Sequence, residues 1–162
     1  MTVRIRSDLF KEAMGRFATG VAVVTTVGPD GDRVGFTANA VASVSLDPLL
    51  VLVSVDQSSS SLDPLLETGF FALSFLHADD LEVAHRFASG ERDTRFEGLK
   101  VRSEVTGAPI LESALAWVDC TVWKVVEAGD HHVVFGEVQG CGVSSEGTPL
   151  LYFRGGFGTM SP

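Results

Sequence analysis

Short runs of β-branched and aromatic residues recur along the chain, and turn-forming residues separate them. The run VAVVTTV at 21–27 is followed by a Pro-Asp-Gly turn and then by RVGFTA, which predicts a β-hairpin. The runs at 49–55 and 70–76 are continuously apolar and too short for a comfortable helix, which favours strands buried on both faces. Further strands are predicted at 115–126, 132–138 and 150–153.

Helical spacing of apolar residues is confined to short segments. The first predicted helix follows a capping Asp8 and ends near Gly20, and we expect it to pack its apolar face on the sheet. Its apolar positions are Phe10, Ala13, Met14, Phe17 and Ala18. A second helix is predicted to begin near Pro64, and a third to follow a capping box formed by Asp79 and Glu82.

The order of these elements favours an antiparallel fold. Strands do not alternate regularly with helices, so a doubly wound parallel sheet is not expected. We predict a mainly β protein in which six or seven strands form an antiparallel barrel with a few short flanking helices. The chain of 162 residues contains no linker or repeat and has the size of a single domain, which we place at 1–162.

The net charge limits the partners that the chain attracts. Twelve Lys and Arg against 21 Asp and Glu give a formal net charge of −9, which repels nucleic acid at long range. A phosphate-bearing ligand must therefore be bound locally, by backbone amides, hydroxyl groups or an individual Arg. No apolar run reaches the length of about 18 residues that spans a membrane, and the start lacks a signal-peptide pattern. We therefore expect a cytoplasmic protein with no membrane partner.

Metal and thiol chemistry have little support in the sequence. Cys120 and Cys141 are too few and too far apart for a redox pair or a zinc site, and we expect both thiols to be buried. The histidines lack the spacing of a metal site, so no metal is predicted. They are His77, His85, His131 and His132.

Two stretches rich in small and hydroxylic residues are candidates for ligand binding. They are GFTANAVASVS at 35–45 and SSSS at 58–61. Small side chains let backbone amides approach a flavin ring, and hydroxyl groups can hold a phosphate. The alternative is a plain strand and turn followed by a helix cap, and composition leaves both interpretations open.

Within the stretch from Phe10 to Phe157, five segments taken in order carry a resemblance to a known family. They are GVAVVTTVGPDGDRVGFTANAVASVSLDPLLVLVSVD, SSSSLDPL, FALSFLHADDLEVAHRFA, GDHHVVFGEV and PLLYFRGGFG. In this order they resemble the flavin reductase-like family of split-barrel FMN-binding proteins. One departure is Pro48-Leu49, where the family commonly has two prolines, although a single proline still restricts the turn.

The resemblance implies a homodimeric, six-stranded antiparallel split β-barrel that binds FMN or FAD near the dimer interface. It also implies hydride transfer from NADH or NADPH to the flavin, and supply of reduced flavin to a partner monooxygenase. Two alternatives are a protein that keeps its flavin and reduces another small acceptor, and a flavin-binding module without turnover. The sequence does not choose between FMN and FAD or between NADH and NADPH.

The family's functional positions correspond to particular residues of this chain. The resemblance implies that His131 lies near the nicotinamide or the flavin edge, whereas the alternative is a surface turn histidine. Phe96 is expected to cover the flavin or to anchor its loop, and Tyr152 to approach the ring or to lie in the core. The resemblance also implies a set of flavin contacts, in which the last three serines hold the phosphate and the other residues lie along the ring and its chain. These residues are Thr37, Ala38, Asn39, Ala40, Ser54, Val55, Asp56, Ser59, Ser60 and Ser61.

Overall fold

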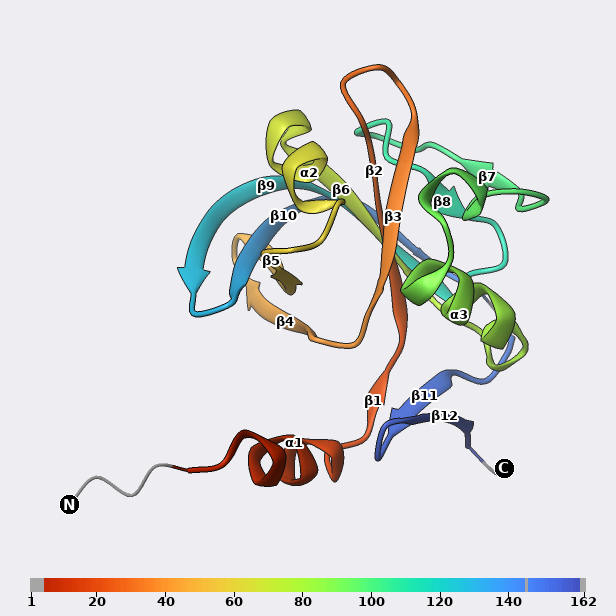
Figure 1. Ribbon diagram of the computed structural model, residues 1–162. Helices are drawn as coiled ribbons and strands as arrows, with labels where there is room; N and C mark the ends of the chain where they lie inside the picture. Colours follow the sequence, from red (N-terminus) through yellow and green to blue (C-terminus); the bar gives the residue numbers. More distant parts are fainter. Residues whose placement is uncertain (1–4, 145, 161–162) are drawn as a thin grey trace.

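Seven strands form the main sheet of the computed structural model, which describes residues 5–144 and 146–160 (Figure 1). Their order is β3-β2-β6-β9-β10-β5-β4, and every neighbouring pair is antiparallel. The apolar runs that predicted three of these strands do form β2, β5 and β6. The bounds are β2 (Ala22–Val27), β3 (Arg33–Ala38), β4 (Val41–Leu46), β5 (Leu49–Asp56), β6 (Phe70–Phe75), β9 (Ala116–Ala128) and β10 (His131–Val143).

The sheet differs from the expected six-stranded barrel in strand number and in closure. It has a seventh strand, and its end strands β3 and β4 are not paired with each other, so the sheet is open over the described ranges. The additional strand arises because the segment VASVSL forms β4 and returns as a hairpin into β5, with an irregularity between Ser43 and Ser45. Sequence analysis did not assign this segment as a separate strand, because it belongs to the stretch of small and hydroxylic residues at 35–45 for which ligand binding and a plain strand and turn were both left open.

Two smaller sheets complete the strand structure. β11 (Leu150–Phe153) lies between β1 (Thr19–Gly20) and β12 (Gly156–Thr159), and β7 (Val101–Arg102) pairs with β8 (Ile110–Leu111). The tight turn between β11 and β12 needs positive φ angles, which are 52° at Arg154 and 76° at Gly155. Sequence analysis predicted β11 but not β12, because GFGT has little of the apolar alternation that marks a strand.

The helices are α1 (Ser7–Gly15), α2 (Leu62–Thr68) and α3 (Leu81–Ser89), with short 3₁₀ turns η1 (Ala78–Asp80) and η2 (Arg92–Thr94). The capping box expected from Asp79 and Glu82 is wrong, because the cap lies upstream at His77. The Asp79 N–H donates to His77 Nδ1 at 3.1 Å, and the His77 N–H donates to Asp80 Oδ2 at 3.2 Å. An imidazole nitrogen can accept as a Ser oxygen does, so it caps η1, which leads directly into α3.

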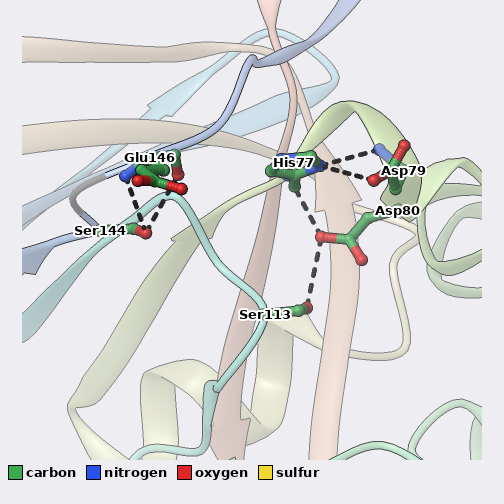
Figure 2. Close-up of polar contacts among 6 residues, drawn as sticks. All are labelled: His77, Asp79, Asp80, Ser113, Ser144 and Glu146. Carbon is green, nitrogen blue, oxygen red and sulfur yellow. Dashed lines mark hydrogen bonds and ion pairs between the residues drawn. The ribbon is translucent and has the colours of Figure 1, made fainter.

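The polar groups around this cap satisfy one another. Figure 2 shows that Asp80 also accepts from the Ser113 hydroxyl, at 3.3 Å, while the Ser144 hydroxyl donates to the Glu146 carbonyl at 3.1 Å. The cap therefore joins the end of β6 to the loop before β9. This cluster is structural and lies apart from the cavity described below.

The apolar core has two main parts. In the first, Leu62 and Leu65 of α2 pack on buried residues of β2, β5, β6, β9 and β10. In the second, Val83, Ala84 and Phe87 of α3 pack with residues of β8 and β11. Burial of each large aliphatic or aromatic side chain contributes about 1.5–3 kcal/mol, so both helices are held by their apolar faces.

Helix α1 does not pack its apolar face on the sheet, so that expectation is wrong. None of its residues is buried, and Phe10 and Met14 are 61% and 53% exposed. Figure 1 shows α1 at the end of the molecule where β1 meets β11, away from the main sheet. The helix ends at Gly15, well before Gly20, because the following residues enter β1.

The two cysteines have different environments, and the prediction that both are buried is wrong for Cys141, which is exposed on β10. Cys120 is buried, and burial raises the pKa of its thiol to about 12. Among residues 5–144 and 146–160, no helix has the length and apolar character needed to cross a membrane.

Candidate functional site

A cavity of about 430 Å³ lies where the carboxyl ends of β3 and β5 meet the start of β10 and the end of α3. Its lining combines small residues, hydroxyl groups, an amide, a carboxylate, an imidazole and a guanidinium. The lining residues are Phe36, Thr37, Ala38, Asn39, Ala40, Ser54, Asp56, Ser58, Ser59, Ser60, Phe87, Ala88, Arg95 and His131.

Strand pairing brings these segments together. His131 is the register partner of Asp56, and the Ser54 N–H donates to the Ala40 carbonyl at 3.0 Å. The Thr37 hydroxyl donates to the Ala84 carbonyl at 2.7 Å and so ties β3 to α3. Because the proton of that hydroxyl is already used, the Thr37 side chain can offer a ligand only its acceptor lone pairs.

The serine-rich segment forms a tight turn after β5. Asp56 Oδ1 accepts from both the backbone N–H and the hydroxyl of Ser58, each at 2.7 Å. These bonds, the hydroxyl first, hold the pKa of the Asp56 carboxyl below its usual value. Ser59 and Ser60 line the cavity, as does Ser58, which sequence analysis did not assign.

Ser61 and Val55 lie behind the cavity wall. Ser61 precedes α2, and its buried hydroxyl has no hydrogen-bond partner within the described part of the chain. Val55 is 1% exposed and belongs to the first core cluster, since it alternates with the cavity-lining Ser54 and Asp56 along β5. Neither side chain is part of the lining.

His131 stands beside a carboxylate at the start of β10. Its Nδ1 lies 2.7 Å from Asp130 Oδ1, and this hydrogen bond is the main cause of the lowered pKa of the Asp130 carboxyl. An ionised carboxylate only accepts, so Nδ1 carries a proton and Nε2 is the nitrogen left for a ligand. His132, the next residue, alternates to the other face of the strand.

The segment after α3 places Arg95 in the cavity and Phe96 outside its lining. Phe96 packs edge-on against Phe87, with ring centroids 4.9 Å apart, and therefore anchors the loop. Sequence analysis considered Phe96 and passed over Arg95. The only signal for Arg95 was the general expectation that backbone amides, hydroxyl groups or an individual Arg would bind a phosphate in this acidic protein.

A second cavity, of about 600 Å³, adjoins the first and shares Asn39, Ala40 and Ser54 with it. It lies between α1, the β4–β5 hairpin and β11, and Phe10, Met14, Phe17 and Tyr152 contribute apolar walls. Tyr152 also packs against Phe157, with centroids 5.5 Å apart. The described residues contain no group of three or more His, Cys, Asp or Glu side chains suited to a metal ion.

A polar cavity beside a more apolar one is suited to a ligand that has a polar end and an apolar body. The chain matches the flavin reductase like domain over residues 14–161, and it belongs to that family.

Relatives and solved structures agree with this assignment. The chain is 42% identical to a flavin reductase of Pseudomonas putida over 149 residues, which are 92% of this chain and 87% of the relative. It is 37% identical to the reductase subunit of a flavin-dependent monooxygenase of Mycobacterium tuberculosis, over 100% of this chain and 87% of that one. A solved structure of the Streptomyces globisporus NADH:FAD oxidoreductase, in complex with NAD and FAD fragments, superposes with a TM-score of 0.90 at 32% identity. That match covers 100% of this chain and 98% of that chain.

Proposed function

We propose that this protein is an NAD(P)H-dependent flavin reductase that reduces FMN or FAD and supplies reduced flavin to a partner monooxygenase. The observation that carries the proposal is the junction of the two cavities at Asn39, Ala40 and Ser54. A flavin nucleotide has the matching form, since its flat ring system is joined through a hydroxylated chain to a phosphate. The flavin reductases and the monooxygenase reductase subunit among the relatives support the same activity.

The donor groups of the cavities fit a flavin nucleotide. Ser59 and Ser60 offer hydroxyls for the phosphate, and the small residues at 37–40 let backbone groups approach the ring and its chain. Tyr152 offers an aromatic face in the adjoining cavity. We assign Val55, Ser61 and Phe96 to the support of the cavity walls.

The flavin supplies the redox chemistry, because its ring accepts a hydride from a reduced nicotinamide without an acid, base or nucleophile from the protein. The chain's contribution is to hold the two ring systems in contact and to exclude water. We assign His131 to the nicotinamide side, where Asp130 fixes a proton on Nδ1 and Nε2 of the neutral ring can accept a hydrogen bond from the carboxamide N–H.

The proposed assembly is a homodimer in the cytoplasm. The homodimer is supported by the apolar face of α1, where Leu9, Phe10 and Met14 are all more than half exposed. Such a face is a typical site of protein–protein contact. A second copy that covers it would also close the apolar cavity, because Phe10 and Met14 belong to that cavity's wall.

The test is a turnover assay in which NADH or NADPH is mixed with the protein and excess FMN or FAD, and the loss of nicotinamide absorbance is followed. We expect many turnovers per protein with at least one of the pairings, and none when free flavin is omitted. Cycling of protein-bound flavin onto another acceptor would instead favour a fixed prosthetic group. Flavin binding without oxidation in any pairing would leave only a binding module.

A further inference from the structure

Arg95 is the one residue of the polar cavity's lining with a permanent positive charge. The chain as a whole is acidic, with a formal net charge of −9, so this cation is not part of a generally basic surface. Neighbouring arginines have carboxylate partners: Arg86 lies 2.9 Å from Glu82, and Arg92 lies 2.8 Å from Asp32. Over the described ranges, no carboxylate lies within ion-pair distance of Arg95.

Backbone carbonyl groups hold the Arg95 guanidinium in place. Its Nε donates to the Gly90 carbonyl at 3.1 Å, and Nη1 donates to the Gly35 carbonyl at 2.6 Å. A Cβ at Gly35 would lie 2.9 Å from the Val24 carbonyl oxygen, so only glycine lets β3 run this close to β2 while its own carbonyl meets Arg95. A guanidinium has more N–H donors than these two bonds use, and the remaining donors are available to a ligand.

The surrounding loop is fixed before any ligand arrives. Arg92 pairs with Asp32 on the β2–β3 turn, Arg86 Nη1 donates to the Glu97 carbonyl at 2.7 Å, and Phe96 packs on Phe87. A charge held in this way needs little reordering on binding, which favours affinity. The segment around Arg95 is thus a preorganised part of the cavity wall.

Burial without a counter-ion leaves this charge incompletely compensated. Partial burial is the main cause that lowers the pKa of Arg95, and repulsion from Arg92 adds to it. A partly desolvated cation gains most from an anion that can accept several N–H groups at once, and phosphate is such an anion. Ser59 and Ser60 line the same cavity, and their hydroxyls can supply neutral donors for the same oxygens, whereas the Ser58 hydroxyl already donates to Asp56.

We infer that Arg95 is the cationic anchor for the phosphate group of the flavin nucleotide. The inference rests on the proposed function, and it names the residue that distinguishes FMN and FAD from riboflavin. The reduced nicotinamide nucleotide also carries phosphate, but the flavin is favoured because the serine turn and Arg95 line one cavity. The assignment does not depend on which flavin nucleotide is used, since both carry a phosphate at the end of the ribityl chain.

The experiment compares the Kd values of FMN, FAD and riboflavin for the wild-type protein, Arg95→Gln and Lys124→Gln. We expect Arg95→Gln to weaken FMN and FAD about 10- to 150-fold, the range for a hydrogen bond to a charged group, with riboflavin unchanged within about twofold. Lys124→Gln, which removes an exposed positive charge on β9 outside both cavity linings, should change none of the three Kd values more than about twofold. Arg95→Lys should lie between wild type and Arg95→Gln, because it keeps the charge and loses the planar fork.

Three outcomes would overturn the inference. An equal loss for FMN and riboflavin would show that Arg95 only ties the loop to β3. Unchanged flavin Kd values with a raised KM for NADH or NADPH would assign the charge to the nicotinamide nucleotide. Unchanged values throughout would exclude any ligand role. In all three cases the wild-type protein still binds and reduces flavin, so they are distinct from failure of the proposed function.

A measurement on the wild-type protein gives the same answer if the Arg95 variants do not fold. We expect FMN affinity to fall severalfold between 50 and 500 mM salt (about 0.05 to 0.5 M ionic strength), because added ions screen and compete for the cation, while riboflavin affinity stays nearly constant. Inorganic phosphate should compete with FMN and not with riboflavin. Equal salt responses for the two flavins, or no competition by phosphate, would contradict the inference.

Discussion

Helices α1 and α3 have the same length and a similar amphipathic pattern, but only α3 buries its apolar face. In α3, Val83, Ala84 and Phe87 are buried in the second core cluster, whereas α1 has no buried residue. Each helix also carries a Glu–Arg pair four residues apart, Glu12 with Arg16 and Glu82 with Arg86. The pattern therefore specifies a helix, and the arrangement of the chain decides whether its apolar face finds a partner within the same molecule.

The strongest test of this difference is Phe87→Ala against Phe10→Ala. Phe87 is 1% exposed, and its truncation should lower the free energy of unfolding by about 3–5 kcal/mol at every protein concentration. Phe10 is 61% exposed, and its truncation should change the stability of the dilute protein by no more than about 0.5 kcal/mol. Urea unfolding at low and high protein concentration measures both values.

Concentration dependence supplies the control for this pair. If the proposed dimer covers Phe10, the cost of Phe10→Ala should grow as the protein concentration rises, because the side chain is then buried only in the assembled molecule. A large cost in the dilute protein would show that α1 packs within its own chain after all.

Part of this arrangement was predictable from sequence, and part was not. The runs at 21–27, 49–55 and 70–76 predicted strands correctly. β6 is largely buried as expected, whereas β5 alternates buried and partly exposed residues, because one of its faces lines the cavity. β4 was not assigned as a separate strand, because its mostly exposed residues form no apolar run and belong to the hydroxylic stretch considered for ligand binding. The His77 cap was missed because an imidazole acceptor is outside the usual set of capping residues.

The site shows the same division. Residues 37–40, Ser59, Ser60 and His131 were assigned through the family resemblance, and the structure places them in one cavity, although their roles stay proposals. Arg95 was not predicted as a site residue, because its place in the cavity depends on Gly35, which is sixty positions away in the chain. The Gly35 carbonyl accepts from the guanidinium and holds it in the cavity. A contact between residues so far apart in the chain produces no local sequence pattern from which it could be predicted.

The second test asks whether α1 finds its partner in another copy of the chain. The double substitution Phe10→Ser with Met14→Ser removes two apolar side chains from one face, each contributing about 1.5 kcal/mol or more when buried. We expect the dimer Kd, measured by analytical ultracentrifugation, to rise roughly a hundredfold or more.

The matched control for the dimer test is Leu81→Ser on α3. Leu81 is also exposed, at 43%, but lies outside the α1 face, so its substitution should leave the dimer Kd unchanged. A double variant that dimerises like the wild type would remove α1 from the interface.

The smallest expected effect concerns the two Glu–Arg pairs, and it shows whether α3 differs from α1 only through its buried face. Arg16 lies 3.1 Å from Glu12 and is 54% exposed, so Arg16→Ala should cost about 0.3–0.5 kcal/mol, the usual value of an exposed helix pair. Arg86 is 26% exposed and also donates to the Glu97 carbonyl at 2.7 Å, so Arg86→Ala should cost about 1.5 kcal/mol or more, because a charged hydrogen bond is lost with the pair.

Urea unfolding of the two variants compares these costs, and amide hydrogen exchange of residues 91–98 should accelerate only in Arg86→Ala. Equal costs with unchanged exchange would mean that the Arg86–Glu97 contact does not fix the loop that carries Arg95, and that burial of Val83, Ala84 and Phe87 alone separates the two helices.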